Sequence, residues 1–240
     1  MQDIPARERL IFALDVPDAG AARRLVEQLE DSVVFYKLGL ELLMAGGYHE
    51  LLAWLVARGK KVFADIKFYD IPATVAAAVR QLAGRGVTFA TVHGNQAIME
   101  AAVAAAGDVR ILAVTVLTSF DRGDLEELGY AGDVQQLVIA RARRALAAGC
   151  AGVICSGIEA EAIRRELGAR LLVVTPGIRP AGDRAEDDQK RVLTVERAFA
   201  AGADYVVVGR QIRDAADPRA TAEAIQGSIL ASLAAALKAS

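Results

Sequence analysis

Charged side chains interrupt an apolar strand in the run 61–72 (KVFADIKFYDIP). Asp65 and Lys67 are two residues apart, so on a strand they point to the same face, and Asp70 follows just before Pro72 ends the extended segment. This spacing predicts one ammonium group between two carboxylates. A lone pattern of this kind is usually a solvated salt-bridge cluster, but burying charge is costly, and polar residues elsewhere in the chain favour a functional site.

Lys67 in this setting is suited to act as an acid. Neighbouring carboxylates favour the ammonium form, whereas a Schiff-base lysine requires the neutral amine. Asp15 and Lys37, which end two earlier apolar segments, can accept hydrogen bonds from sugar hydroxyls and donate to them. We interpret His93, also at a strand end, as a structural histidine at the rim of the site.

Two arginines in the last third of the chain indicate a phosphate site. Arg210 follows Gly209 and opens a predicted helix, where the helix dipole disfavours a cation unless an anion is also bound. Arg179, in the segment TPGIRP, is expected at the same corner, with Gln189 on the polar loop that follows. We therefore expect a phosphomonoester here. The loop 182–191 fits either a solvated surface loop or a lid that closes over the phosphate.

Apolar segments alternate with amphipathic helical segments along the chain. Strands are expected at 10–15, 33–37, the run that begins at 61, 87–93, 111–118, 151–156, 171–175 and 204–209. Helices are expected at 19–29, 41–57, 73–83, 97–105, 134–148, 159–167 and 195–201, with a short acidic turn before 134 and an Ala-rich closing helix. The cluster Arg141, Arg143 and Arg144 is interpreted as a solvated helix face.

Eight strand-helix units predict an α/β fold, a (β/α)8 TIM barrel, as a single domain over 1–240. A doubly wound open sheet is the alternative, but its Gly-rich fingerprint is missing after the first strand. In a barrel, the carboxyl ends of all strands surround one mouth. Polar residues end the otherwise apolar strands, so one site should collect them: Asp15, Lys37, Asp65 with Lys67, His93, Thr118, Ser156, Arg179 and Arg210.

Bulk properties exclude several classes of function. The formal net charge of -2 gives no basic surface for nucleic acid, and no segment approaches the ~20 apolar residues of a membrane span. The amino-terminal segment has no apolar signal core. Cys150 and Cys155 are spaced neither as a redox pair nor as zinc ligands, so we expect buried, reduced thiols. The interpretation is a cytoplasmic protein with no nucleic-acid or membrane partner.

Taken together, these motifs closely resemble one enzyme family. The chain carries D-x-K-x-x-D-I from Asp65, TPGIRP from Thr175, DDQ ending at Gln189, and the late Gly209-Arg210 pair, in order with ALD, YKLG and VLTS segments. This combination resembles bacterial orotidine 5'-phosphate decarboxylase over nearly the whole chain. The resemblance implies decarboxylation of orotidine 5'-monophosphate to uridine 5'-monophosphate, the last step of de novo synthesis of that nucleotide, without cofactor or metal.

The resemblance also implies roles for individual residues. Lys67 would stabilise and protonate the C6 carbanion, with Asp65 and Asp70 beside it. The family works as a homodimer in which Asp70 reaches the neighbouring subunit's site. The implied substrate-binding residues are Asp15 and Lys37 for the ribose, Thr118 for the pyrimidine, Arg179, Gln189, Gly209 and Arg210 for the phosphate, together with Ile71, Thr74 and Pro176.

Two alternatives remain open at this point. A magnesium-dependent decarboxylase or aldolase acting on a sugar phosphate shares the D-x-K-x-x-D motif, although the TPGIRP and DDQ segments separate it from this chain. A non-catalytic barrel that binds nucleotides is the other class. Retention of Lys67 argues against it, because binding alone gives little reason to bury that charge.

Overall fold

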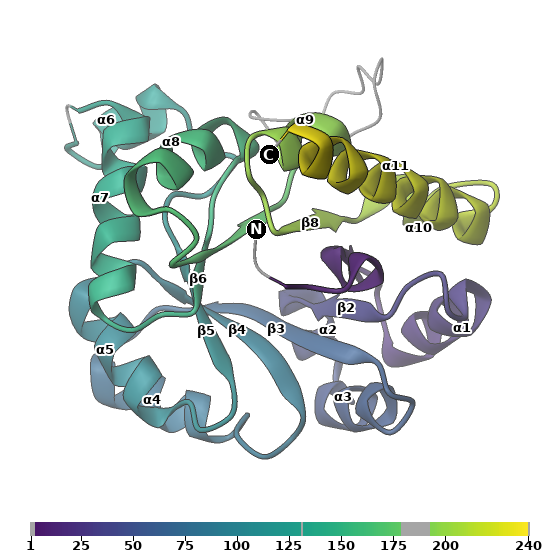
Figure 1. Ribbon diagram of the computed structural model, residues 1–240. Coiled ribbons are helices and arrows are strands. Elements are labelled where there is room, and N and C mark those ends of the chain that lie inside the picture. The colour runs from purple at the N-terminus through teal and green to yellow at the C-terminus, as the bar shows by residue number, and fades with distance from the viewer. Residues whose placement is uncertain (1–2, 131, 179–192, 240) are drawn as a thin grey trace.

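The computed structural model describes residues 3–130, 132–178 and 193–239. Eight strands close into a barrel in the order β1-β2-β3-β4-β5-β6-β7-β8, and every neighbouring pair, including β1 with β8, is parallel. Helices surround the strands (Figure 1). The predicted (β/α)8 barrel is therefore confirmed, and the open sheet is excluded.

The bounds of the elements follow the predicted alternation. The strands are β1 Leu10–Ala13, β2 Phe35–Leu38, β3 Lys61–Phe68, β4 Val87–His93, β5 Arg110–Val114, β6 Gly152–Ile154, β7 Leu172–Thr175 and β8 Tyr205–Val208. The helices are α1 Ala19–Leu29, α2 Leu40–Ala45, α3 Tyr48–Val56, α4 Pro72–Arg80, α5 Gln96–Ala105, α6 Arg122–Glu127, α7 Val134–Ala147, α8 Gly157–Leu167, α9 Val195–Ala200, α10 Arg210–Arg213 and α11 Pro218–Ala239. A 3-10 helix, Ala6–Arg9, precedes β1.

Strand alternation divides the core into two parts. Alternate residues of each strand point outward to the helices or inward to the barrel axis. Four inward aromatic rings fill the middle of the barrel, with centroid separations of 5.3 to 6.0 Å, and belong to Phe35, Phe63, Phe89 and Tyr205. This layer is packed and buried, so it fixes the strands beneath the mouth. Truncating such a ring to alanine costs about 3–5 kcal/mol.

One predicted helix is in fact two. The segment 41–57 was expected to be continuous, but α2 ends at Ala45 and α3 begins at Tyr48. Gly46 and Gly47 separate them with φ values of 85° and 72°, a left-handed region that glycine adopts without steric cost. The break turns α3 along the barrel wall and leaves α2 next to the mouth.

The segment after β5 also differs from expectation. The predicted strand 111–118 ends at Val114, and the predicted acidic turn contains the helix α6. Asp121 and Asp124 form a capping box, in which each carboxylate accepts a hydrogen bond from the other residue's N–H. Acidic residues that suggested a turn thus begin a helix.

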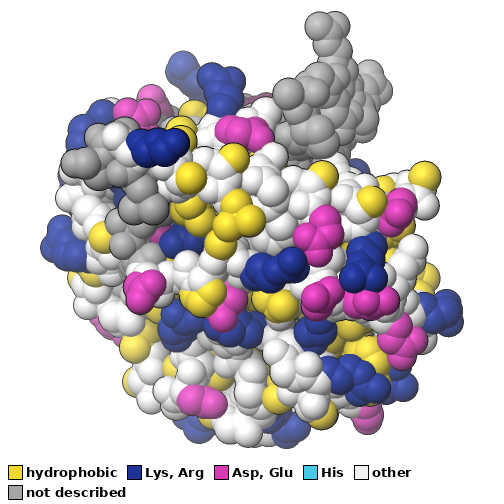
Figure 2. All heavy atoms as spheres, turned by 45° about the vertical axis from the view of Figure 1, so that its right-hand side comes forward, with side chains coloured by type: hydrophobic (Ala, Val, Ile, Leu, Met, Phe, Trp, Pro, Cys, Tyr) yellow, Lys and Arg dark blue, Asp and Glu magenta, His cyan; other side chains and the backbone are white. Residues whose placement is uncertain are grey.

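The closing helix completes the outer ring. α11 contacts both α9 and α1, so the two ends of the chain's helical layer meet. On the face drawn in Figure 2, cationic and anionic side chains are interspersed, in keeping with the small net charge. Within the described ranges, no helix is both long and apolar enough to cross a membrane.

Candidate active site

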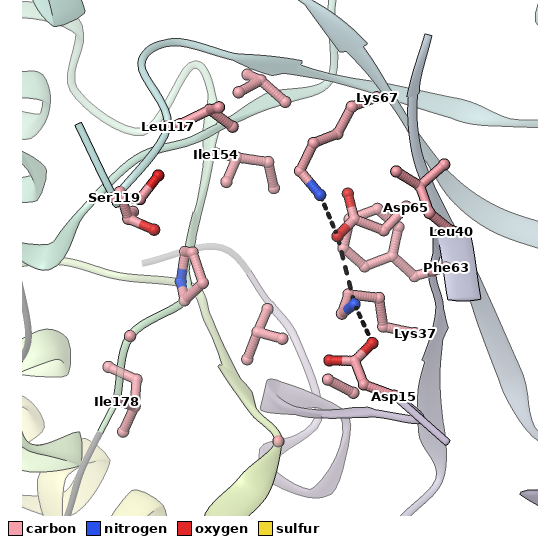
Figure 3. A pocket seen from close by; sticks show the side chains of 18 of the residues that line it. Asp15, Lys37, Leu40, Phe63, Asp65, Lys67, Leu117, Ser119, Ile154 and Ile178 are labelled. Carbon is pink, nitrogen blue, oxygen red and sulfur yellow. Dashed lines mark hydrogen bonds and ion pairs between the residues drawn. The ribbon is translucent and has the colours of Figure 1, made fainter. Parts of the chain in front are cut away.

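A cavity of about 430 Å³ lies where the strands end at their carboxyl side. Its lining combines charged and apolar side chains (Figure 3). Of the residues predicted for the site, the cavity is lined by Asp15, Lys37, Asp65, Lys67, Thr118, Pro176, Gly209 and Arg210. Since these come from six different strands or the loops after them, the barrel brings together residues that are far apart in sequence.

Four charged side chains form a row across one wall of the cavity. Lys37 Nζ lies 3.1 Å from Asp15 Oδ1 and 3.5 Å from Asp65 Oδ2, and Lys67 Nζ lies 2.9 Å from the same Asp65 oxygen. Figure 3 shows the alternating row as Asp15, Lys37, Asp65 and Lys67. The Asp65 and Lys37 side chains are nearly buried, so their mutual attraction is weakly screened by solvent.

Burial and charge act in opposite directions on the two central groups. Burial alone would raise the pKa of Asp65, but Lys37, Lys67 and two hydrogen bonds outweigh it and leave that pKa below its usual value. Burial alone would lower the pKa of Lys37, but Asp65 and Asp15 outweigh it and leave that pKa raised. Both groups are therefore charged at neutral pH.

The backbone around Lys67 departs from a regular strand. Lys67 has a φ of 53°, which is uncommon for a residue other than glycine and costs about 1–3 kcal/mol. The β3–β4 register also shifts between Ala64 and Phe68. The Lys67 N–H donates to Thr91 Oγ1 at 3.0 Å, and the Thr91 hydroxyl donates to Asp65 Oδ1 at 2.9 Å. Asp65 and Lys67 meet as expected, but through this irregularity rather than through simple alternation.

The expected position of the Lys67 ammonium between Asp65 and Asp70 is not found within one chain. Asp70 is exposed, and its carboxylate accepts a hydrogen bond from the Ile71 N–H at 2.6 Å. Instead, Asp65 is a single carboxylate between two ammonium groups. Asp70, Ile71 and Thr74 are all exposed and do not line the cavity, because β3 ends at Phe68 and the chain leaves the mouth there.

Gly209 lies beside Asp15, at the end of the charged row away from Lys67, and Arg210 follows it in the cavity lining. α10 begins at Arg210 as predicted, and Pro176 and Gly177, which follow the neighbouring strand β7, also line the cavity. A Cβ at Gly209 would lie 3.4 Å from Ala13 Cβ and 3.8 Å from Asp15 Oδ2, both in the lining, so glycine keeps this space open for a ligand. The predicted phosphate residues Arg179 and Gln189, and the loop 182–191, lie outside the described residues.

Several residues that line the cavity were not predicted from the sequence. Ser119, Leu117, Ile154 and Val207 also line the cavity, and the apolar members give it a wall without charge (Figure 3). Ser119 follows the predicted Thr118 directly, which is a usable signal. The apolar residues give no such signal in the sequence, because an inward valine or isoleucine at a strand end cannot be distinguished by residue type from one in the core.

Arg141, His93 and Ser156 make structural contacts outside the cavity. Arg141 was placed on a solvated helix face, but it is half-buried and donates to the Thr115 carbonyl just after β5, whereas Arg143 and Arg144 are exposed. His93 and Ser156 end their strands without lining the cavity. The His93 ring packs against the Tyr69 ring, and Ser156 caps α8 by accepting a hydrogen bond from the Ile158 N–H, so both have structural roles.

The chain is similar over most of its length to enzymes of one family. The model of the orotidine 5'-phosphate decarboxylase / HUMPS family matches residues 8–225. An orotidine 5'-phosphate decarboxylase from Methylococcus capsulatus is 60% identical over 226 residues, which are 94% of this chain and 93% of the relative. The relative of the same name from Stenotrophomonas maltophilia is 54% identical, covering 95% of both chains.

A solved structure gives the same result for the fold. The crystal structure of orotidine 5'-phosphate decarboxylase from Lactobacillus acidophilus superposes with a TM-score of 0.82 at 33% sequence identity. The match covers 92% of this chain and 99% of that one. The similarity thus extends over the whole barrel and includes the strands that carry the charged row.

Proposed function

This chain belongs to the orotidine 5'-phosphate decarboxylase / HUMPS family and converts orotidine 5'-monophosphate to uridine 5'-monophosphate, and from that premise we propose that Lys67 is its central catalytic group. The observation that carries the proposal is the Lys67 ammonium, which lines the cavity and is held 2.9 Å from Asp65. The magnesium-dependent alternative is not favoured, because the curated relatives at 60% and 54% identity are decarboxylases of the orotidine nucleotide.

The chemistry requires a fixed positive charge. When the bond between C6 and the carboxylate breaks, carbon dioxide leaves and the electron pair stays on C6, where the ring offers no adjacent electron sink. The Lys67 ammonium stabilises that pair and then transfers a proton from Nζ to C6, and solvent reprotonates the amine. Because Asp65 already holds the ammonium in place, little reorganisation accompanies the step. Leu117 and Ile154 supply an apolar wall that excludes water from the reacting carbon.

We assign other residues to the ribose, the pyrimidine and the phosphate of the nucleotide. Asp15 and Lys37 hold the ribose hydroxyls, since one accepts and the other donates hydrogen bonds. Thr118 contacts the pyrimidine edge. The phosphate binds beside Gly209 and Arg210, and the other residues proposed for its site are Pro176, Arg179 and Gln189. Binding energy from this remote group is available to assemble the reactive geometry around Lys67.

We further propose a homodimer with shared active sites. Exposed apolar side chains follow the neighbouring strands β2 and β3, with exposed fractions of 82% for Met44, 67% for Ile71, 65% for Tyr69 and 55% for Leu40. If a second copy covered this patch and the exposed Thr74 near it, Asp70 would reach the partner's Lys67. The exposed position of Asp70 supports this assignment, because the carboxylate has no ion pair among the described residues of its own chain.

The compartment we propose is the cytoplasm. Cys150 and Cys155 are buried, as expected, and neither forms a disulfide with a described residue; burial raises the pKa of the Cys150 thiol to about 12. A thiol of that pKa forms little thiolate at neutral pH and is slow to oxidise. Cysteines outside disulfides suit a reducing compartment.

Turnover of orotidine 5'-monophosphate, followed by absorbance with chelator present, tests the catalytic assignment. We expect metal-free turnover by the native chain and a loss of at least about 1000-fold in Lys67→Ala, since the residue supplies both charge stabilisation and the proton. Lys61→Ala is the matched control, because Lys61 begins the same strand and pairs with Glu8 at the far end of the barrel.

The outcomes separate the alternatives. Native turnover that stops with chelator would point to the magnesium-dependent class, for which no group of three or more candidate ligands is present among the described residues. Tight nucleotide binding without turnover would point to a non-catalytic barrel. Full activity in Lys67→Ala would refute the role of Lys67 and leave the decarboxylation itself standing.

A further inference from the structure

Thr91 lies beneath the charged row, on the neighbouring strand β4. Its side chain is fully buried, and it does not line the cavity. Its hydroxyl nevertheless contacts both central residues: it accepts from the Lys67 N–H at 3.0 Å and donates to Asp65 Oδ1 at 2.9 Å. One oxygen atom thus joins the backbone of Lys67 to the side chain of Asp65.

The Thr91 hydroxyl gives the Lys67 N–H a hydrogen-bond acceptor that the β3–β4 pairing does not provide. Ala64 pairs with Ala90 and Phe68 with Val92, so the segment 65–67 of β3 lies opposite Thr91 alone. In this bulge the Lys67 N–H has a side-chain acceptor in place of a carbonyl on β4. A positive φ at a residue with a side chain persists only where its surroundings determine it, and this hydrogen bond is such a determinant.

The same hydroxyl fixes the rotation of the Asp65 carboxylate. Oδ1 accepts from Thr91, whereas Oδ2 faces both Lys67 Nζ and Lys37 Nζ. A partial rotation of the carboxylate would move one oxygen away from the ammonium groups and break the hydrogen bond from Thr91 to the other. The two ammonium groups therefore face an oxygen whose position is set from below.

We propose that Thr91 is a positioning residue for the decarboxylation, holding Lys67 in its left-handed backbone conformation and directing Asp65 Oδ2 toward the ammonium groups. Thr91 acts only through these two residues and has no contact with the substrate cavity. The inference rests on the catalytic role proposed above for Lys67.

The first test removes the hydroxyl with little change of shape. Thr91→Val leaves the Lys67 N–H and one Asp65 oxygen without their partner, and we expect kcat to fall roughly 10- to 100-fold, as for a small misplacement of a reacting group. KM should change little, because the cavity lining is intact. Thr91→Ser keeps the hydroxyl and should restore most of kcat.

Thr115→Val is the matched control. Thr115 is also fully buried near a strand end, but its hydroxyl donates to the Ile154 carbonyl at 2.8 Å, away from the lysine pair. Losing that hydrogen bond should reduce stability and leave kcat close to native. If Thr91 had only a structural role, Thr91→Val would behave like Thr115→Val: stability would fall and kcat would stay close to native.

The pH profile of kcat gives a second readout. Thr91 is one of the donors that keep Asp65 ionised, so its loss should move the acid limb of the profile to higher pH in Thr91→Val and not in Thr91→Ser or Thr115→Val. The other groups that face Asp65 are unchanged in all three variants: Lys37 from β2, Lys67 on β3 and Tyr48 from α3, with Asp15 beyond Lys37.

The proposal is overturned if Thr91→Val retains native kcat and the native acid limb, or if Thr115→Val loses kcat to the same extent. Should the valine variant fail to fold, Thr91→Ala is compared with Thr91→Ser, and equal kcat values would overturn the proposal. Failure of the function is distinguishable, because it appears as absent turnover in the native chain. Failure of the Lys67 assignment appears as turnover in Lys67→Ala.

Discussion

The rings of His93 and Tyr69 pack against each other in a tilted arrangement, with centroids 4.7 Å apart and planes inclined by 45°. The contact joins the end of β4 to the segment that follows β3, one residue before Asp70. Tyr69 is otherwise exposed, so the histidine ring restrains the segment that carries the proposed shared carboxylate. A histidine at this rim therefore has a structural task without entering the cavity.

His93 should remain neutral at pH 7. Burial, together with the nearby cations Arg141 and Lys67, lowers its pKa from the usual 6.5. The chain has only two histidines, so imidazole proton resonances are assigned by comparing the native protein with His49→Gln. We expect the His93 resonance to titrate below 6.5. A value above 6.5 would mean that the cations do not face this ring.

This shift has a defined effect on stability. A histidine with a lowered folded pKa contributes no pH dependence above the unfolded pKa, because both states are neutral there. As pH falls below about 6.5, the unfolded chain binds the proton first, and the folded state loses stability. His93→Gln should flatten this part of the curve of unfolding free energy against pH, whereas His49→Gln serves as the comparison.

Asp65→Asn should weaken the fold at neutral pH. The carboxylate lies between Lys37 and Lys67 and is nearly buried, so its removal leaves repulsion between two ammonium groups and costs roughly 3 kcal/mol. The pKa of Asp65 is lowered in the folded state, so its contribution is present above the unfolded value of 3.8 and is lost as pH falls below it. Urea unfolding from pH 7 to 3 measures both effects.

An exposed carboxylate provides the control for this series. The pKa of Asp214 is also lowered, first by its hydrogen bond from Arg213, but the side chain is more than half exposed. Solvent screens such a pair, so Asp214→Asn should cost less than about 1 kcal/mol. Equal losses in the two variants would indicate that burial does not strengthen the Asp65 interactions.

Strand periodicity predicted the barrel and the gathering of these charged residues at one mouth, because both depend on residue type at regular spacing. Asp15, Lys37, Asp65 and Lys67 are polar residues at the ends of apolar strands, and a closed barrel leaves them one place to meet. The prediction did not depend on locating each strand end correctly, since the residues remain at the same mouth when a strand is shorter by a few positions.

Features set by backbone conformation were not predictable in the same way. Nothing in the residue types of β3 indicates that Lys67 has a positive φ. The alternation rule correctly placed Lys67 beside Asp65, but the contact forms through the bulge in β3 and not through regular alternation. Thr91 is one threonine on an apolar strand, and its role depends on the bulge opposite it. Asp70 was placed beside Lys67 by spacing, but the end of β3 carries it out of the mouth.

Arg210→Gln should weaken binding of the nucleotide through its phosphate. A charge-assisted hydrogen bond is worth about 1.5–3 kcal/mol, so the affinity for uridine 5'-monophosphate should fall roughly 10- to 100-fold. Affinity for uridine should stay at the native value, which makes the nucleoside the internal control. Calorimetry measures both, and parallel losses for uridine would show that Arg210 supports the cavity rather than the phosphate.

Removal of the phosphate from the substrate should reduce turnover as well as affinity. Binding energy from the remote phosphate is expected to assemble the geometry around Lys67, so orotidine should react with a lower kcat than its 5'-monophosphate even at saturation. Single-turnover measurements at saturating nucleoside separate binding from chemistry. An unchanged kcat would mean that the phosphate contributes only to binding.

Mixing two inactive variants tests the shared site. Lys67→Ala and Asp70→Ala should each be inactive alone, but a hybrid dimer contains one site with both native residues if Asp70 crosses to the partner. Random exchange in an equal mixture makes half of the dimers hybrids, so we expect about one quarter of native activity. Lys67→Ala mixed with Asp65→Ala is the matched control, because those two residues belong to one chain's site and no hybrid restores it. Subunit exchange is verified by mass spectrometry of tagged chains. If exchange is complete and activity does not return, Asp70 does not act across the interface.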